Sequence, residues 1–257
     1  MTTKQLLIAL YTLIRRELVR MFRISSQVFL PPVITTTLYF LIFGSLIGNR
    51  IGTIEGVSYT LFIAPGLIMM SVITNAYGNV STSLFSHRFQ KSIEEILVSP
   101  MNNGQLLLGY VMGGVLRGLI VAILVYAISF LFVDIHFNHI PLTLLVILLV
   151  SALFSLAGFT NAMLARNFDD IMIIPTFVLT PLTYLGGVFY STTMLPPFWQ
   201  TVSHFNPILY MVNALRYAII GHHEVSMTLS MSIILLMVIL LTVLNLVLLK
   251  KGIGLRD

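Results

Sequence analysis

Six long hydrophobic runs follow one another along the chain, separated by short polar segments. Each run is continuously apolar and does not alternate with polar residues, so the pattern predicts transmembrane helices and not transmembrane strands. The expected spans cover about residues 27–48, 59–81, 106–133, 141–165, 171–190 and 227–249. The sequence therefore predicts an all-α integral membrane protein, with residues 1–257 forming a single transmembrane domain.

Residues 1–26 have an amphipathic pattern. Four arginines at helical spacing cluster on one side of this segment: Arg15, Arg16, Arg20 and Arg23. Apolar residues recur on the opposite side: Leu10, Ile14, Leu18 and Met21. The pattern predicts an interfacial helix whose arginines face lipid phosphates. The alternative is a solvated face on a helix that packs against other protein.

Residues 191–226, between the last two expected spans, are not a simple turn. Their apolar run 208–220 has 13 residues and is too short to cross a bilayer. It follows Asn206-Pro207, where we expect a break between two short helices. Irregular backbone at membrane depth is tolerated only inside protein or beside water. This re-entrant segment is therefore a candidate for lining or gating the outer end of a pathway.

The composition supports a membrane protein and excludes several other classes. Hydrophobic residues make up 57% of the chain and charged residues 9%, against about 25% charged in soluble domains. This excludes a water-soluble enzyme, a disordered protein and a nucleic-acid-binding protein. The net charge of +5 is explained by topology, because 11 of the 14 lysines and arginines fall on one side of the expected spans. Both termini are therefore expected in the cytoplasm.

The segment 83–104 carries the densest mixture of charges in the chain. The charged and titratable residues are His87, Arg88, Lys91, Glu94 and Glu95. Ile93, Ile96 and Leu97 would form the apolar face of a short helix that ends at Ser99-Pro100. Such a helix on the cytoplasmic side would dock a soluble partner; the alternative is a solvated loop.

Several kinds of chemistry are missing. No glycine precedes a lysine, so there is no Walker A motif, and there are no cysteines. His222-His223 with Glu224 is a poor metal site, because adjacent histidines do not share a helix face. Arg117 is the one charge expected within a span. We expect it to reach the cytoplasmic interface; a buried role in substrate contact or helix pairing is the alternative.

Glycines at four-residue spacing recur in two of the spans. The pairs are Gly44 with Gly48, Gly109 with Gly113, and Gly114 with Gly118. Small residues at this spacing allow helices to approach closely, so we expect tight helix packing at these positions.

Two segments resemble the type-2 ABC export permeases. Residues 92–100 read Ser-Ile-Glu-Glu-Ile-Leu-Val-Ser-Pro, close to the family pattern T-x-E-x-L-L-x-(S/T)-P after span two. The stretch before the last span contains Gly186-Gly187-Val188-Phe189, Leu195-Pro196, Trp199, Asn206-Pro207 and Asn213-Ala214-Leu215-Arg216, in the order seen in that family. The chain departs from the family at Ser92, at Ile96, and at Asn213, which stands where an acidic residue is usual.

The resemblance implies a permease subunit of an ATP-driven exporter in the bacterial inner membrane. A coupling helix would contact a separate ATPase subunit through Arg88, Lys91, Glu94, Glu95, Leu97, Ser99 and Pro100. Two permease copies would pair, and the re-entrant segment would line or gate the route through Gly186, Gly187, Pro196, Trp199, Asn206, Pro207, Asn213 and Arg216. No cofactor is expected on this chain, since ATP and magnesium would bind the partner. The alternatives are a secondary transporter or channel and an intramembrane enzyme. The sequence does not specify the substrate, whether drug, lipid-like molecule or glycan.

Overall fold

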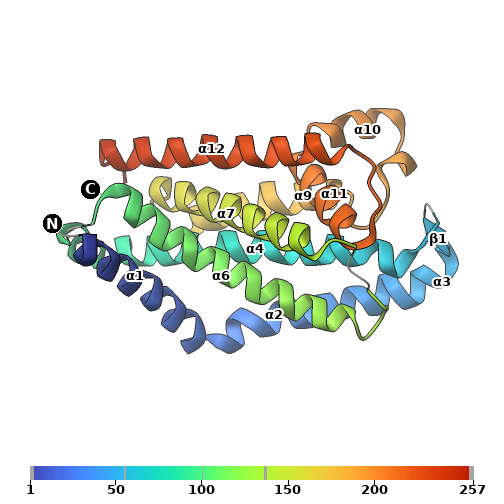
Figure 1. Cartoon of the computed structure of the whole chain (residues 1–257), viewed down its shortest axis with the longest axis horizontal. Coiled ribbons are helices and arrows are strands. Elements are labelled where there is room, and N and C mark those ends of the chain that lie inside the picture. The colour runs from blue at the N-terminus through green and yellow to red at the C-terminus, as the bar shows by residue number, and fades with distance from the viewer. Residues whose placement is uncertain (1–2, 55, 100, 136–137, 255–257) are drawn as a thin grey trace.

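The computed structural model describes residues 3–54, 56–99, 101–135 and 138–254, and these are almost entirely helical (Figure 1). Six helices within these ranges are long and apolar enough to cross a membrane. They cover Ser25–Ile47, Tyr59–Phe89, Asn103–Ser129, Ile140–Leu164, Phe168–Leu185 and Met227–Lys251. The predicted all-α membrane protein with six spans is confirmed.

The elements follow the expected order. Helix α1 (Thr3–Arg23) precedes the first span, which consists of α2 (Ser25–Tyr39) and the π-helical segment η1 (Phe40–Ile47). A short α3 (Gly48–Ile51) and a two-stranded hairpin, β1 (Thr53–Ile54) with β2 (Val57–Ser58), lead into α4 (Tyr59–Phe89). Then come α5 (Ile93–Val98), α6 (Asn103–Ser129) and α7 (Ile140–Leu164). The fifth span joins α8 (Phe168–Ile173), η2 (Ile174–Leu179) and α9 (Thr180–Leu185). The chain continues through the 3₁₀ turn η3 (Thr192–Met194), α10 (Pro197–His204), α11 (Pro207–Ile220) and α12 (Met227–Lys251).

Helix α4 is longer than predicted. It continues to Phe89, so the first part of the expected loop 83–104 is helical. Helix α6 begins earlier than predicted, because Asn102 and Gln105 form a capping box. The Asn102 side chain accepts from the Gln105 N–H at 2.8 Å, and the Gln105 side chain accepts from the Asn102 N–H at 3.1 Å. The non-helical part of the segment is correspondingly short.

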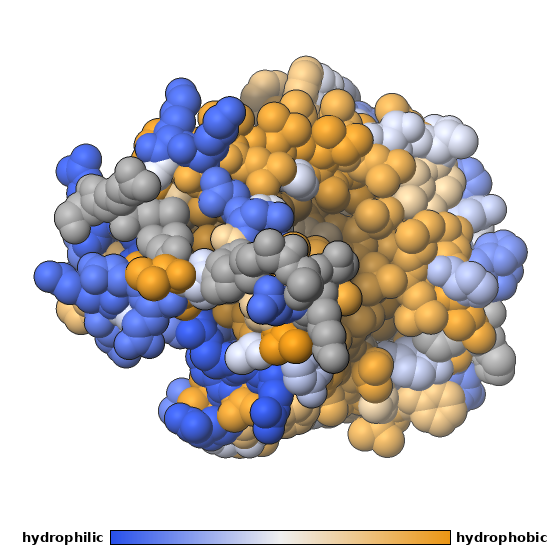
Figure 2. Space-filling model, turned by 60° about the vertical axis from the view of Figure 1, so that its left-hand side comes forward, coloured by the Kyte–Doolittle hydropathy of each residue, from blue (hydrophilic) through white to orange (hydrophobic). Residues whose placement is uncertain are grey.

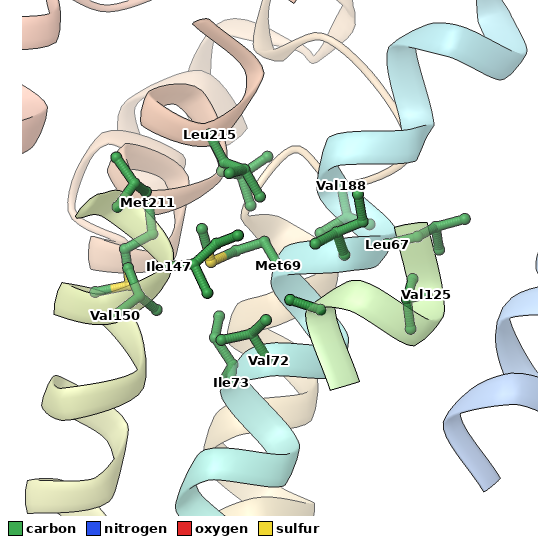
Figure 3. Packing of buried hydrophobic residues seen from close by; sticks show 14 of the residues in the cluster. Leu67, Met69, Val72, Ile73, Val125, Ile147, Val150, Val188, Met211 and Leu215 are labelled. Carbon is green, nitrogen blue, oxygen red and sulfur yellow. The ribbon is translucent and has the colours of Figure 1, made fainter. Parts of the chain in front are cut away.

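The hydrophobic core is built around α4. Figure 3 shows Leu67, Met69, Val72 and Ile73 of this helix meeting side chains from α6, α7 and α11. Two-thirds of the most apolar stretch of α4 is buried, against about a sixth of that of α12. Burial of apolar area stabilises a core in water, but in lipid this central position depends on close packing.

Glycines in α6 permit that close packing. A Cβ at Gly113 would come within 2.9 Å of the Glu17 side chain of α1, and Gly109 lies against Leu13 of the same helix. On the neighbouring side, Gly114 and Gly118 face Ser155 and Ser151 of α7. The predicted tight packing at these glycines is confirmed, and the contacts lie within one chain.

The two ends of the molecule differ. Helix α1 begins and α12 ends at the same end, which we call the basic end because Arg15, Arg88, Lys91, Arg166 and Lys250 belong to the segments that meet there (Figure 1). The hairpin, α10 and α11 lie toward the opposite end. This arrangement places the two segments singled out in the sequence at opposite ends of the bundle.

Candidate coupling surface and outer clamp

Helix α5 has two distinct faces. Ile93 and Ile96 are 3% and 8% exposed and pack into a hydrophobic cluster with residues of α4, α6 and α7. Glu94 and Glu95 are exposed in its first turn, where negative charge suits the helix N-terminus. The backbone turns to an extended conformation at Ser99, which ends the helix. The short two-faced helix predicted from the sequence is confirmed; Pro100 and the side chain of Leu97 lie outside the described residues.

Arg88 has partners inside the protein. Its guanidinium donates to the carbonyl oxygens of Ala162, Met163 and Ala165, the latter two at 3.1 and 3.2 Å. These carbonyls belong to the last turn of α7, where a cation satisfies free acceptors and the helix dipole. Arg88 therefore ties the end of α4 to the end of α7, which the sequence did not predict.

An exposed surface surrounds α5 at the basic end. We call it the coupling surface, and it consists of Phe89, Lys91, Glu94, Glu95, Val98, Arg166 and Phe168. Phe89 and Val98 are 65% and 86% exposed, and the Phe89 ring lies edge-to-face against Phe168 at 5.1 Å. Figure 2, which brings this end of the molecule forward, shows hydrophilic residues gathered beside hydrophobic ones. Exposed aromatic and aliphatic side chains among mixed charges are typical of a protein contact site.

The structure divides the four arginines of α1. Arg15 and Arg23 are exposed, as predicted for a helix that faces lipid or solvent. Arg20 instead donates to Glu17 at 3.0 Å and to the carbonyl and side-chain oxygens of Asn79 at 3.1 and 3.0 Å. Arg16 donates to the Tyr110 hydroxyl at 3.4 Å. Arg16 and Arg20 thus also contact protein groups, which the sequence did not predict, and they line one open pocket together with Arg15 and Arg23.

Glu17 explains why Arg20 turns inward. Its carboxylate is almost fully buried, accepts from the Ser83 hydroxyl at 2.8 Å and pairs with Arg20. A buried carboxylate needs a cation and hydrogen-bond donors to offset the loss of hydration. The buried side of α1 is therefore centred on Leu13, Glu17 and Met21. Of the predicted apolar stripe only Met21 is fully buried, and the other three residues are partly exposed.

At the opposite end, α10 and α11 are the two short helices predicted on either side of Asn206-Pro207. The Asn206 side chain accepts from the Ile208 N–H at 3.0 Å and donates to the Leu182 carbonyl at 2.6 Å. It thus caps α11 and fastens that helix to α9. Gly221 ends α11 in the left-handed conformation at φ 76°.

Arg216 of α11 is the centre of a buried polar network. Its side chain is 1% exposed, pairs with Glu224 at 3.4 Å and donates to the Gly187 carbonyl at 2.6 Å. Its guanidinium lies 3.9 Å from the centre of the Phe62 ring, within range of a cation–π contact. The family resemblance implies that Arg216 lines or gates a route, and the structure buries its side chain within this network.

Glu224 and Asn213 complete the network. Glu224 also accepts from the Thr192 N–H at 3.0 Å and from the Thr192 hydroxyl. The Asn213 oxygen accepts from the N–H groups of Glu224 and Val225, while its amide donates to the Val225 carbonyl and the Ser230 hydroxyl. We call Gly187, Thr192, Asn213, Arg216 and Glu224 the outer clamp. Burial and then the Glu224 carboxylate raise the pKa of the nearby Tyr190.

The remaining predicted residues of this segment lie around the clamp. Gly187 needs a positive φ of 71°, and a Cβ at Gly186 would come within 2.8 Å of Ile208. Pro196 precedes α10, and Trp199 is 44% exposed on that helix beside Phe198. Gly187, Asn213 and Arg216 are thus brought together. Among the described residues, no hydrogen bond or ring contact joins Pro196 or Trp199 to them.

Comparison with known proteins identifies the family. The family model described as "ABC-2 type transporter" matches residues 8–220. The chain belongs to the ABC-2 type transporter family. It is 51% identical over 250 residues to "Inner membrane transport permease YadH" of Escherichia coli (strain K12), covering 97% of this chain and 98% of that one. It is 24% identical over 217 residues to "Nodulation protein J" of Neorhizobium galegae, covering 81% and 80% of the two chains.

This ABC-2 permease is therefore a multi-pass inner-membrane transport subunit. Family membership implies, in general, a partnership with an ATPase subunit. The structure shows two buried carboxylates that the sequence did not predict, Glu17 of α1, which pairs with Arg20, and Glu224 of the outer clamp. The signal for Glu17 was its position three residues before Arg20, as the one acidic residue of an amphipathic helix. Glu224 had no such signal, because it meets Arg216 only through the fold.

Proposed function

We propose that this ABC-2 permease is the membrane-spanning subunit of an ATP-driven exporter. Two copies would form the pathway as a homodimer, and a separate ATPase subunit would dock on the coupling surface from the cytoplasm. ATP and magnesium would bind that partner, and this chain would carry no cofactor. Both termini would lie in the cytoplasm, since the basic end carries the positive charge that favours that side.

The observation that carries this proposal is the two-faced α5. Its exposed carboxylates and the neighbouring Phe89 offer a partner both charge and apolar contact, while Ile93 and Ile96 anchor the helix in the core. A force applied to α5 would reach α4 directly along the chain. It would reach α7 through Arg88, whose guanidinium bonds to the end of that helix. A docking helix with these attachments can transmit motion of the ATPase into the spans.

Charge reversal on α5 tests the proposal. The tagged permease is co-expressed with ATPases encoded in the same genome, and the ATPase retained on purification is measured. We expect the double variant Glu94→Lys, Glu95→Lys to lower the amount of retained ATPase about tenfold or more. A tenfold loss of affinity corresponds to ~1.4 kcal/mol of binding free energy. Asp134→Lys is the matched control, since this carboxylate is exposed before α7 at the opposite end.

The outcomes are separable. Failure of the wild-type chain to retain any ATPase would overturn the proposal. Equal retention by the wild-type chain and by the variant without both carboxylates of α5 would also overturn it. Flux driven by an ion gradient through the permease alone in liposomes would favour a secondary transporter or channel instead.

A further inference from the structure

A polar cavity of about 200 Å³ lies between α2, α4 and α6. Thr36, Ser71 and Asn75 contribute hydroxyl and amide groups to its wall, and Arg117 of α6 contributes a guanidinium. Polar side chains gathered between transmembrane helices are costly unless they serve each other or a ligand. None of these residues belongs to the coupling surface or the outer clamp.

Arg117 lies deep along its helix. At 1.5 Å per residue, it is about 21 Å from the start of α6 at Asn103 and about 18 Å from its end at Ser129. A hydrocarbon layer of about 30 Å that lies within the length of this helix therefore encloses the Cα atom of Arg117. Its guanidinium hydrogen-bonds to Asn75 of the neighbouring helix α4, which is the helix-pairing contact that the alternative prediction allows.

The charge of Arg117 is not neutralised within the described residues. Its Nε and Nη2 both donate to the Asn75 side-chain oxygen, at 3.2 and 2.9 Å. This neutral acceptor takes two of the five N–H donors of the guanidinium. Arg20 acts on Arg117 as a like charge and so adds to the local positive potential. In the described ranges no salt bridge to Arg117 is found.

A second copy of the chain offers no carboxylate from its span interiors. The nine acidic residues stand at positions 17, 55, 94, 95, 134, 169, 170, 224 and 257. Those at 169 and 170 are in the first turn of the fifth span, and the others lie outside the six spans. A dimer contact between spans would therefore leave Arg117 without a counterion. A ligand can supply one.

The cavity opens on the outside of the bundle. Thr35 and Thr74 at its rim are exposed, whereas Thr36 and Leu67 are buried in its wall. On α2, the neighbouring Leu30, Ile34 and Leu38 are half exposed and present an apolar surface to the membrane. The volume is below the 300–1,000 Å³ of drug-sized pockets, so a compact headgroup fits inside while an apolar body remains outside.

We propose that this cavity binds one oxyanion, a phosphate or carboxylate group, with Arg117 as its charged donor and the threonine and serine hydroxyls as further donors. A guanidinium binds oxyanions through paired hydrogen bonds, which are strengthened in a water-poor setting. The anion is carried by a lipid-like molecule, since the cavity opens at membrane depth beside apolar side chains. If that molecule is the exported substrate, this assignment rests on the proposed function, whereas binding itself does not.

Binding is tested on the full-length chain purified in detergent, by native mass spectrometry with phosphatidic acid and phosphatidylcholine of equal chain length. We expect the wild-type chain to retain one phosphatidic acid with about tenfold preference. We expect Arg117→Gln to abolish that preference. Arg117→Lys should keep part of it, since lysine retains the positive charge but lacks the paired N–H donors of the planar guanidinium. Arg50→Gln is the matched control, because it removes an exposed arginine of α3, and no residue of α3 lines the cavity.

A second variant guards against misfolding of Arg117→Gln. Thr74→Trp fills the mouth of the cavity while leaving Arg117 in place, and we expect it to lose the bound lipid as well. Inorganic phosphate is then added as a competitor. Displacement of the lipid would show that a free oxyanion is enough to occupy the site, and no displacement would show that the site requires the lipid-borne headgroup. A wild-type chain without preference for the anionic lipid, or variants that keep it, would overturn the proposal. No ATPase is needed, so this result is independent of the coupling test.

Discussion

Two arginines of this permease have opposite surroundings. Arg216 in α11 is buried, pairs with Glu224, bonds to the Gly187 carbonyl and lies on the Phe62 ring. Arg117 in α6 is half-buried beside a cavity and bonds to one neutral oxygen of Asn75. Both arginines interrupt apolar helices, so their positions in the sequence do not show that their surroundings differ.

The difference indicates two kinds of role. A cation whose charge and donors are matched by the protein holds elements together, and it has little left to offer a ligand. A cation within the membrane that has no counterion destabilises the protein, and binding of an anion can offset this cost. We therefore expect Arg216 to have a structural role and Arg117 to have a ligand-binding role. Substituting each arginine and comparing the effects on stability tests this difference.

The largest expected effect follows removal of the clamp cation. Arg216→Ala leaves the buried Glu224 carboxylate unpaired, and breaking a buried pair in this way costs about 3–5 kcal/mol. The free energy of unfolding of the purified permease is measured by thermal denaturation in detergent. Arg50→Ala is the control, because Arg50 is exposed beside the hairpin.

A double variant refines that test. Arg216→Met together with Glu224→Met removes both charges, so it should recover part of the loss. Recovery stays incomplete because Thr192 loses the acceptor for its N–H and hydroxyl. If Arg216→Ala were no less stable than Arg50→Ala, the clamp would have no structural role and the comparison would fail.

A smaller effect is expected at Asn213. Asn213→Asp restores the acidic residue usual in this family, yet a carboxylate cannot donate to the Val225 carbonyl or the Ser230 hydroxyl. We expect a loss of about 1–3 kcal/mol, the cost of buried groups left unsatisfied. Asn102→Asp serves as the control, since aspartate caps a helix as well as asparagine does. Equal stability of the two variants would contradict this prediction, because it would show that the clamp tolerates a carboxylate at position 213 beside Glu224.

The sequence predicts the spans well because continuous apolar runs determine membrane crossing almost alone. It predicts the end of α4 poorly, because Ser83 and Arg88 read as polar loop residues. In the fold their partners are Glu17 and the last carbonyls of α7, so the helix continues. For the same reason the sequence identified Arg216 without its counterion. Glu224 lies eight residues further on, after α11 has ended, and only the folded loop brings it back.

The smallest effect on stability is expected at Arg117. Arg117→Gln gives up two bonds to a single neutral oxygen, worth about 1 kcal/mol, and removes a charge whose presence within a membrane helix costs about 2.5–3.5 kcal/mol. Without anionic lipid the variant should therefore be at least as stable as the wild-type chain. With phosphatidic acid the wild-type chain should gain stability and the variant should not, because only a folded chain with an intact site is stabilised by its ligand. Thermal denaturation in both lipid conditions measures this difference. A loss as large as that of Arg216→Ala without lipid would make Arg117 a second structural arginine, and the distinction between the two sites would be lost.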